Sequence, residues 1–372
     1  LNLFNKNYHY SSKIEKPDAI LVRSSKISSS EIGENLLAIA RVGIGVNNIP
    51  VKYCNANGIV VLNTPGANAN AVNELFIAGI ILSSRKIPRG IEWVKTLKGE
   101  KNIPSIVEKY KSLFSGPEIK GKKIGVIGLG SIGALVASSA LCLEMNVLAY
   151  DPYLSVEKSK KLPRGINRVN SLDTIFSECD YITIHVPYSE KTHHMINTEA
   201  IDQMQPNVRI LNFARAEIVD NVALLDAIEK KKILGYVTDF PQEELIDVEN
   251  VVAIPHLGAS TPESEDNCSF MAVKQIIDYL ENGNIKNSVN FPSIKLERTG
   301  HVRVCISHKN IHGMMNKISG VISKCEINIE NIICKSLDEL AYSIIDIDRH
   351  LPLCALTSLK SIDGIIRMRV IG

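Results

Sequence analysis

The stretch Lys123-Ile-Gly-Val-Ile-Gly-Leu-Gly-Ser-Ile-Gly133 decides the fold of this chain. Its first five residues form a short apolar run typical of a buried strand, and the segment that follows, to about Leu143, is predicted to be a helix. The glycines at 128, 130 and 133 stand between the two with the spacing Gly-x-Gly-x-x-Gly. This arrangement is typical of a dinucleotide-binding turn, in which the backbone approaches a pyrophosphate at the positive end of the helix.

An acidic residue stands where such a turn needs one. Asp151 closes the next predicted strand, 146–150. A carboxylate at this position accepts hydrogen bonds from the 2′- and 3′-hydroxyls of a ribose and repels a 2′-phosphate. The turn therefore predicts NAD, rather than NADP, as the cofactor, with Gly128, Gly130, Ser131, Ile132, Gly133 and Asp151 as binding residues.

Short apolar runs alternate with helical segments on both sides of this turn. Strands are expected at 19–23, 37–42, 58–62, 123–127, 146–150, 180–185, 208–213, 234–238 and 251–254. Long helices are expected at 69–86 and 262–282, and the polar stretch 98–122 is expected to be a connection. This alternation predicts an α/β fold, with the last six strands in one doubly wound parallel sheet, the Rossmann arrangement.

The C-terminal part of the chain follows a different pattern. After a linker at 283–300, strands are expected at 301–307, 327–334, 341–347 and 365–371, with helices at 313–324 and 352–361. The order βαββαβ is that of a ferredoxin-like domain.

Composition and charge exclude several classes of protein. The chain has 372 residues, 45% hydrophobic and 22% charged, which is typical of a globular protein with more than one domain. A formal charge of +2 without a long basic run gives no electrostatic basis for binding nucleic acid or an anionic membrane. No apolar stretch approaches the ~20 residues that span a bilayer.

The cysteines indicate a reducing compartment. None of the eight forms a Cys-x-x-Cys pair or a Cys/His cluster with zinc-ligand spacing, so no metal site is predicted. Residues 1–20 are polar and do not resemble a signal peptide, which predicts a cytoplasmic location. The sequence begins at Leu1 rather than Met, so we expect that its N-terminus is incomplete.

Three polar residues follow successive strands of the predicted sheet. Arg215 follows the strand at 208–213, Glu244 follows the strand at 234–238, and His256 follows the strand at 251–254. Because ligands of open α/β sheets gather at the carboxyl ends of strands, these side chains can converge on one substrate. An arginine can hold the carboxylate of a hydroxy acid, and a histidine can exchange the hydroxyl proton. Taken singly, each also fits an ordinary surface or loop residue.

Several motifs together resemble the D-isomer-specific 2-hydroxyacid dehydrogenase family. They are Gly128–Gly133, Asp151-Pro152, His185-Val-Pro187, Asn212-Phe-Ala-Arg215, Asp239 and Pro255-His-Leu-Gly-Ala-Ser-Thr261, in order over nearly all of residues 19–290. The resemblance implies that Arg215 binds the substrate carboxylate, that Glu244 orients His256, and that His256 is the acid/base. Glu243 is adjacent to Glu244, and the register with Gly235 and Asp239 favours Glu244.

The resemblance also implies a domain plan and further cofactor contacts. A flavodoxin-like substrate-binding domain is expected at 1–90 with 266–297, an NAD-binding domain at 91–265, and an ACT regulatory domain at 301–372. Residues 1–18 alone precede the first predicted strand, so the family's opening strand is expected to be missing. The additional cofactor-binding residues implied are His185, Val186, Pro187, Phe213, Ala214, Arg215, Asp239, His256 and Gly258.

Two features resemble the family members that oxidise D-3-phosphoglycerate to 3-phosphohydroxypyruvate, the opening step of L-serine synthesis. The first is an early strand that ends in Arg-Ser, followed by a glycine loop that can offer amides to an anion. The substrate-binding residues implied are Arg23, Ser24, Gly43, Ile44, Gly45, Val46 and Asn68. Lys26 and Arg41 are further basic residues nearby. Arg23, Lys26 and Arg41 also fit ordinary charged residues of a protein surface.

The second feature is the ACT-like C-terminal region. His308, Asn310 and Asn328 match the spacing of a serine effector site, although such a domain can also serve only as a dimer interface. A homodimer is expected through the helix at 69–86 and its surroundings, and pairing of ACT domains would give a homotetramer. The competing functions are another D-2-hydroxyacid dehydrogenase, such as a hydroxypyruvate/glyoxylate reductase, and a non-catalytic NAD-sensing interaction protein.

Overall fold

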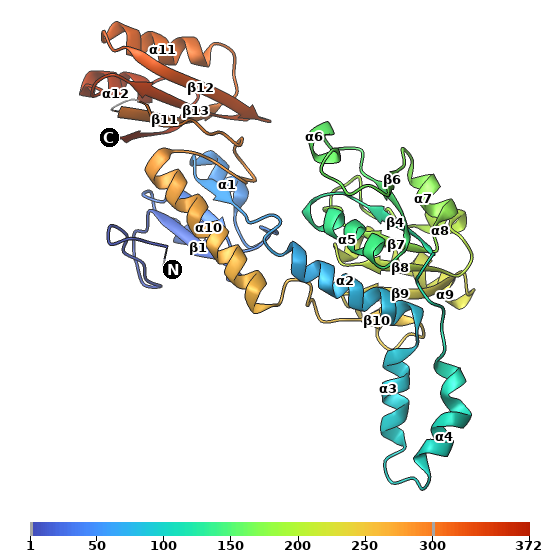
Figure 1. Ribbon diagram of the computed structural model, residues 1–372. Coiled ribbons are helices and arrows are strands. Elements are labelled where there is room, and N and C mark those ends of the chain that lie inside the picture. Colours follow the sequence, from blue (N-terminus) through green and yellow to red (C-terminus); the bar gives the residue numbers. More distant parts are fainter. Residues whose placement is uncertain (1–2, 300–301) are drawn as a thin grey trace. The chain divides into compact units, whose positions relative to one another are not determined.

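The computed structural model describes residues 3–299 and 302–372, and its chain divides into two compact units (Figure 1). One unit runs from Asn68 to Ser264, and the other combines the chain up to Ala67 with Glu265–Gly372. His301, the first residue of the predicted C-terminal strand, lies outside the described residues, as do Leu1, Asn2 and Gly300.

The unit Asn68–Ser264 is built on a seven-stranded parallel sheet. Its strands are β4 (Lys123–Ile127), β5 (Asn146–Tyr150), β6 (Ile166–Arg168), β7 (Tyr181–Ile184), β8 (Val208–Asn212), β9 (Ile233–Thr238) and β10 (Val251–Ala253). The order β10-β9-β8-β7-β4-β5-β6 reverses its direction beside β4, which confirms the predicted doubly wound sheet. β6 adds an edge strand to the six predicted; only one of its three residues is apolar, so it has no strand signal.

Helices cover both faces of this sheet. α2 (Ala69–Ser84) and α5 (Ser131–Cys142) share one buried core with the sheet. α7 (Leu172–Glu178), α8 (Thr198–Gln203) and α9 (Asn221–Glu229) share the other. α2 falls inside the region 1–90 predicted for the substrate-binding domain, yet Phe76 and Ile80 bury their side chains against this sheet, with Leu211 and Phe213 of the β8 region. Shorter elements are α6 (Val156–Ser159), η3 (Ala216–Ile218) and η4 (Glu243–Leu245).

The stretch 98–122, expected to be only a connection, contains a helix. α3 (Ile87–Thr96) and α4 (Ile103–Tyr110), followed by η2 (Lys111–Phe114), form a hairpin that extends away from the sheet (Figure 1). Pro104 stands in the first turn of α4, where a backbone N–H would have no helical hydrogen-bond partner. The proline is therefore compatible with the helix. Trp93 holds the hairpin together, with its ring centroid 6.2 Å from that of Tyr110 and 5.1 Å from that of Phe114.

The other unit contains two sheets. β1 (Ala19–Val22), β2 (Ala38–Arg41) and β3 (Val60–Leu62) form a three-stranded parallel sheet, accompanied by η1 (Ser29–Glu31) and α1 (Val51–Ala56). The long helix α10 (Pro262–Asn282) enters this unit at Glu265. The three strands match those predicted at 19–23, 37–42 and 58–62, and α10 matches the helix predicted at 262–282.

The C-terminal sheet confirms the predicted ferredoxin-like order. Its elements are β11 (Val302–Lys309), α11 (Met314–Lys324), β12 (Ile329–Leu337), β13 (Leu340–Ile347), α12 (Leu353–Lys360) and β14 (Ile365–Ile371). The strands pair antiparallel as β12-β13-β11-β14. α11 and α12 pack on one face of the sheet, and Cys305, Tyr342 and Ile344 of the other face share a core with Tyr279 of α10 and Leu62 of β3.

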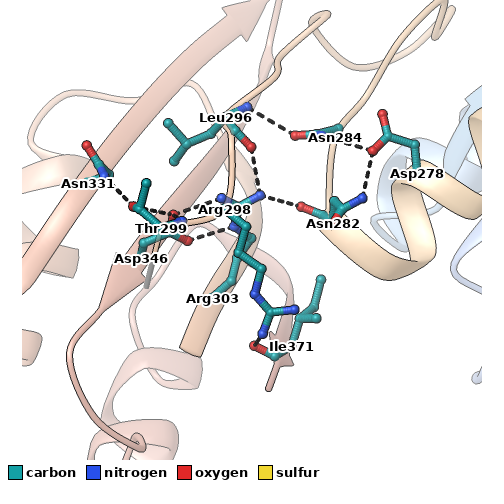
Figure 2. A network of polar contacts seen from close by, with 10 residues as sticks. All are labelled: Asp278, Asn282, Asn284, Leu296, Arg298, Thr299, Arg303, Asn331, Asp346 and Ile371. Carbon is teal, nitrogen blue, oxygen red and sulfur yellow. Dashed lines mark hydrogen bonds and ion pairs between the residues drawn. The ribbon is translucent and has the colours of Figure 1, made fainter. Parts of the chain in front are cut away.

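A buried ion pair fixes this sheet to the segment before it (Figure 2). Arg303 of β11 donates from Nε and Nη2 to the two carboxylate oxygens of Asp346 of β13, at 2.7 and 2.8 Å. Its Nη1 donates to the backbone carbonyls of Asn282 and Leu296, at 2.8 and 2.9 Å. Both charged side chains are 0% exposed. The guanidinium therefore joins two strands of the sheet to the end of α10 and to the predicted linker.

The predicted linker is itself held by side-chain hydrogen bonds. Asp278 of α10 accepts from the amides of Asn282 and Asn284, each at 3.0 Å, and Asn284 Oδ1 accepts from the backbone N–H of Leu296 at 3.0 Å (Figure 2). Thr299 Oγ1 donates to Asp346 at 3.4 Å. Residues 283–299 are thus an ordered part of the unit.

Candidate active site

The glycine turn between β4 and α5 is shaped by close contacts that exclude side chains. Gly128 has φ +92°, and a Cβ atom there would lie 2.7 Å from the carbonyl oxygen of His185. A Cβ atom at Gly133 would lie 1.8 Å from the carbonyl oxygen of Gly128. The N-terminus of α5 is thereby brought against the end of β4, which leaves its first amides for an anionic ligand.

Asp151 is placed beside this turn by two backbone amides. Its Oδ2 accepts from the N–H of Leu129 at 2.8 Å and its Oδ1 from the N–H of Tyr153 at 2.9 Å. A carboxylate has about four acceptor positions, so each oxygen still has a lone pair for a ribose hydroxyl. The turn and this carboxylate fit the pyrophosphate and ribose of NAD, as the sequence predicts.

We expect Asp151→Asn to raise the Kd for NADH about 10- to 100-fold and to reduce discrimination against NADPH, because the negative charge is lost and an asparagine amide can accept hydrogen bonds at only one of its two terminal atoms. Fluorescence titration with both nucleotides measures this. Asp202→Asn on α8 is the control and should leave both affinities unchanged. Unaltered discrimination in Asp151→Asn would contradict the assignment.

His185 lies at the end of β7, beside the turn. Its Nε2 is 2.8 Å from Thr183 Oγ1, and burial lowers the pKa of the imidazole to about 3. The ring is therefore neutral at physiological pH and does not act as a proton donor there. The next residue, Val186, lies so close to Gly128 that a Cβ atom there would contact its side chain. The predicted residues at the end of β7 therefore lie beside the glycine turn.

The end of β8 positions Arg215 through a buried asparagine. Asn212, 0% exposed, accepts from the N–H of Ala214 at 3.1 Å and donates to the carbonyl of Arg215 at 2.8 Å. The Arg215 guanidinium donates to the carbonyl of Ala214 at 2.7 Å and stands 5.8 Å from the centroid of the Phe240 ring.

Asp239, directly after β9, is a buried carboxylate with an unused acceptor. It is 2% exposed; its Oδ2 accepts from the N–H of Gly258 at 3.0 Å, and its Oδ1 has no hydrogen-bond partner among the described residues. Burial raises the pKa of Asp239, against the opposing effects of the Gly258 amide, His256 and Arg215. A buried acceptor of this kind needs a donor, and the carboxamide N–H group of a nicotinamide has the right chemistry.

His256 follows β10 in a left-handed backbone conformation, with φ +49°. Its N–H donates to the carbonyls of Asp239 and Ile254, at 3.0 and 2.9 Å. The imidazole centroid lies 4.7 Å from that of the Phe240 ring. Phe240 thus contacts both the predicted carboxylate-binding arginine and the predicted acid/base. Sequence reasoning did not assign it, and its only signal is its place after Asp239.

Glu244 is not brought to His256. It lies exposed in η4, where its carboxylate accepts from Asn221 Nδ2 at 3.0 Å, and that hydrogen bond lowers the pKa of Glu244. Within residues 3–299 and 302–372, Glu244 makes no ion pair with His256. The orienting role of Glu244 stays a prediction.

The predicted substrate-binding residues are divided between the two units. Asn68 begins α2 in one unit and is buried, with no partner for its Oδ1 among the described residues. Arg23 lies in the other unit, in an ion pair with Glu265 at 2.6 Å. The Gly43 N–H donates to Thr64 Oγ1 at 2.8 Å, so this amide is already engaged. Ser24, Ile44, Gly45 and Val46 lie in the same unit as Arg23.

Two of the three predicted effector residues share a cavity. His308 and Asn310 line a cavity of about 230 Å³ at the C-terminal sheet. Asn328 is not among the residues that line it; the backbone N–H of Asn328 donates to Asp348 Oδ1 at 3.1 Å.

Within residues 3–299 and 302–372, no group of three or more His, Cys, Asp or Glu side chains is arranged to hold a metal ion. No helix among the described residues has the length and apolar character needed to cross a membrane.

The chain resembles known proteins over most of its length. The family model "D-isomer specific 2-hydroxyacid dehydrogenase, NAD binding domain" matches residues 77–258. A D-3-phosphoglycerate dehydrogenase of Haemophilus influenzae is 33% identical over 92% of this chain and 82% of its own length. A hydroxypyruvate reductase of Thermotoga maritima is 38% identical over 72% of this chain and 86% of its own length.

The solved structures agree with this resemblance. An NAD⁺-bound 3-phosphoglycerate dehydrogenase of Entamoeba histolytica is 30% identical, with a TM-score of 0.59 over 76% of this chain and 87% of that one. Several longer relatives are matched over only 49–62% of their length. The protein therefore carries an NAD-binding domain and belongs to the D-isomer specific 2-hydroxyacid dehydrogenase family.

Proposed function

We propose that this protein oxidises D-3-phosphoglycerate to 3-phosphohydroxypyruvate with NAD, the first step of the phosphorylated route to L-serine. The observation that carries the proposal is the group formed by Arg215, Asp239, Phe240 and His256 at the carboxyl ends of β8–β10. Relatives that bear the name D-3-phosphoglycerate dehydrogenase support it.

The residues of this group divide the work between binding and proton transfer. The Arg215 guanidinium holds the substrate carboxylate through paired hydrogen bonds, which orients the hydroxyl-bearing carbon. The His256 imidazole accepts the hydroxyl proton as the carbonyl forms. NAD, when bound, supplies the acceptor for the hydride that leaves this carbon. Glu244 would orient the protonated imidazole after releasing Asn221.

Formation of NADH from NAD and D-3-phosphoglycerate, followed by absorbance, tests the reaction. The L isomer is the stereochemical control, and NADP replaces NAD in a parallel assay. We expect turnover only with the D isomer and a clear preference for NAD. NAD-dependent turnover of the L isomer would contradict the proposal.

The phosphate of the substrate is proposed to bind at Arg23. The side chain is 47% exposed and its charge is shared with Glu265, so it is accessible but partly neutralised. Lys26 lies three positions further along, and Arg41 lies so close to Gly43 that a Cβ atom there would contact its guanidinium. A basic side chain that gains a phosphate contributes charge-assisted hydrogen bonds.

Arg23→Ala is expected to raise the KM for the phosphorylated substrate about 10- to 100-fold, because a charged hydrogen-bond partner is lost, with little effect on unphosphorylated hydroxypyruvate. Steady-state kinetics with both substrates measures this. The matched variant Glu265→Gln removes the competing carboxylate, so it should leave the KM equal or lower. An equal change for both substrates in Arg23→Ala would assign the arginine a structural role.

The second candidate is a hydroxypyruvate or glyoxylate reductase. One observation that favours it is the ion pair between Arg23 and Glu265, because the arginine proposed to bind phosphate is already engaged by a carboxylate. The other is the similarity to the Thermotoga reductase. A non-catalytic NAD-sensing protein is disfavoured by the presence of both Arg215 and His256 in the site. Retention of biological function by a His256→Gln variant would revive that third alternative.

We infer a cytoplasmic homodimer or homotetramer with L-serine as a candidate effector. Most of α2 is buried within its own unit, so the dimer surface is assigned to the neighbouring elements α3 and η2. There the apolar side chains of Ile91, Val94 and Leu113 are each more than half exposed. Light scattering tests the assembly, and inhibition of NADH formation by L-serine tests the effector. A monomer, or activity unchanged by serine, would contradict the respective inference.

A further inference from the structure

A cysteine and a histidine meet at the cavity of the C-terminal sheet. The cavity, about 230 Å³, is lined by the end of β11, the start of α11 and part of β12, including His308, Met315 and Cys334. Cys334 is exposed, and its Sγ lies 3.8 Å from His308 Nε2. Cys142 and Cys354 are also exposed. Cys354 is hydrogen-bonded to Cys325, so Cys142 is the matched comparison for Cys334.

The hydrogen bonds of His308 fix its tautomer. Its Nδ1 lies 2.9 Å from the carbonyl oxygen of Lys309, which can only accept, so Nδ1 carries the proton and Nε2 is an acceptor. The ring is 2% exposed, and burial lowers the pKa of His308, which keeps the imidazole neutral. Nε2 therefore presents a lone pair and can hold a proton only transiently, during a transfer to another group.

Ser343 competes for that nitrogen. Its Oγ lies 2.9 Å from His308 Nε2 and 3.4 Å from Met315 Sδ. When the hydroxyl points to Met315, the lone pair of Nε2 is left for the thiol of Cys334. The carbonyl of Lys309 then orients the imidazole of His308, which acts as the base for the Cys334 thiol, the nucleophile.

We propose that Cys334 is a site of covalent thiol modification, activated by His308, that controls occupancy of this cavity. His308 Nε2 takes the thiol proton, and the Cys334 sulfur attacks a sulfur of a low-molecular-weight disulfide. The S–S bond of the disulfide breaks as the new S–S bond to Cys334 forms, and the departing thiolate takes the proton from His308. The disulfide is thereby half reduced, Cys334 is oxidised to a mixed disulfide, and an added thiol reverses the exchange.

Modification has a regulatory consequence that rests on the proposed function. A glutathione-sized adduct on Cys334 fills space in a cavity of only about 230 Å³, so it excludes a second small ligand. If that ligand is the serine effector, modified protein loses its response to serine. The reactivity of the thiol does not depend on the effector.

Limited treatment of the full chain with glutathione disulfide, followed by peptide mass spectrometry, tests the proposal. Cys334 is expected to react at least about tenfold faster than Cys142, because a positioned base accelerates proton removal. His308→Gln should remove that advantage. Ser343→Ala, which deletes the competing hydroxyl, should increase it and serves as the second variant if His308→Gln does not fold.

Each outcome bears on one claim. Equal reaction rates at Cys334 and Cys142, or an unchanged Cys334 rate in both variants, would overturn the proposal. Selective modification of Cys334 with no enzymatic turnover would support the thiol site and contradict the proposed function, so the two failures are distinguishable.

Discussion

Replacing His256 by glutamine is expected to lower kcat for D-3-phosphoglycerate oxidation about 10²- to 10⁴-fold, the range for loss of a general base. Glutamine keeps the size and polarity of the imidazole but cannot take the hydroxyl proton. The left-handed backbone at His256 is retained by the hydrogen bonds of its own N–H to Asp239 and Ile254. NADH binding should therefore weaken far less than kcat falls, because the other predicted cofactor-binding residues are unchanged.

Steady-state kinetics and NADH titration separate these two effects. His9→Gln, an exposed histidine of the other unit, is the control and should leave both quantities unchanged. A kcat within threefold of the unmodified protein would show that another group carries the proton. Loss of NADH binding together with activity would assign His256 a structural role.

Replacing Arg303 by methionine is expected to destabilise its unit by about 3–5 kcal/mol, because Asp346 is left as an uncompensated buried charge. The double variant Arg303→Met/Asp346→Leu removes both charges and should recover most of that loss. Two backbone carbonyls, of Asn282 and Leu296, also lose their donor, so recovery stays incomplete.

Urea unfolding and hydrogen exchange of the β11 and β13 amides measure this difference. Arg349→Ala is the matched control, because its ion pair with Asp348 is a comparable Arg–Asp contact with the arginine side chain 61% exposed. Such a surface pair contributes at most about 1 kcal/mol. Equal losses for Arg303→Met and Arg349→Ala would contradict the proposed role of the buried pair.

Most of the fold could be predicted because its signals are local. Apolar runs mark the strands, and the glycine spacing after β4 marks the nucleotide turn. Among the elements that were not predicted, β6 is a short edge strand with one apolar residue, and α4 has a proline that a first helical turn tolerates. The placement of α2 depends on its packing against Phe213, which no local pattern encodes.

The site was predicted less completely than the fold. Arg215 follows β8 and His256 follows β10, the two strands that flank β9, so both stand at carboxyl ends of strands at one edge of the sheet, as their positions in the sequence indicate. Phe240 contacts the side chains of Arg215 and His256, and Asn212 donates a hydrogen bond to the carbonyl of Arg215. These contacts arise from tertiary geometry. Tertiary geometry also decides the contact of Glu244. Its position in the sequence favours it as the partner of His256, whereas its carboxylate accepts a hydrogen bond from Asn221.

The most direct test is the rate of NADH oxidation with 3-phosphohydroxypyruvate, compared with hydroxypyruvate, glyoxylate and pyruvate. We expect the kcat/KM for the phosphorylated substrate to be about 10- to 100-fold above the others, the size expected for charged hydrogen bonds to a phosphate. Comparable values for hydroxypyruvate or glyoxylate would contradict it and assign the protein to the general D-2-hydroxyacid dehydrogenases.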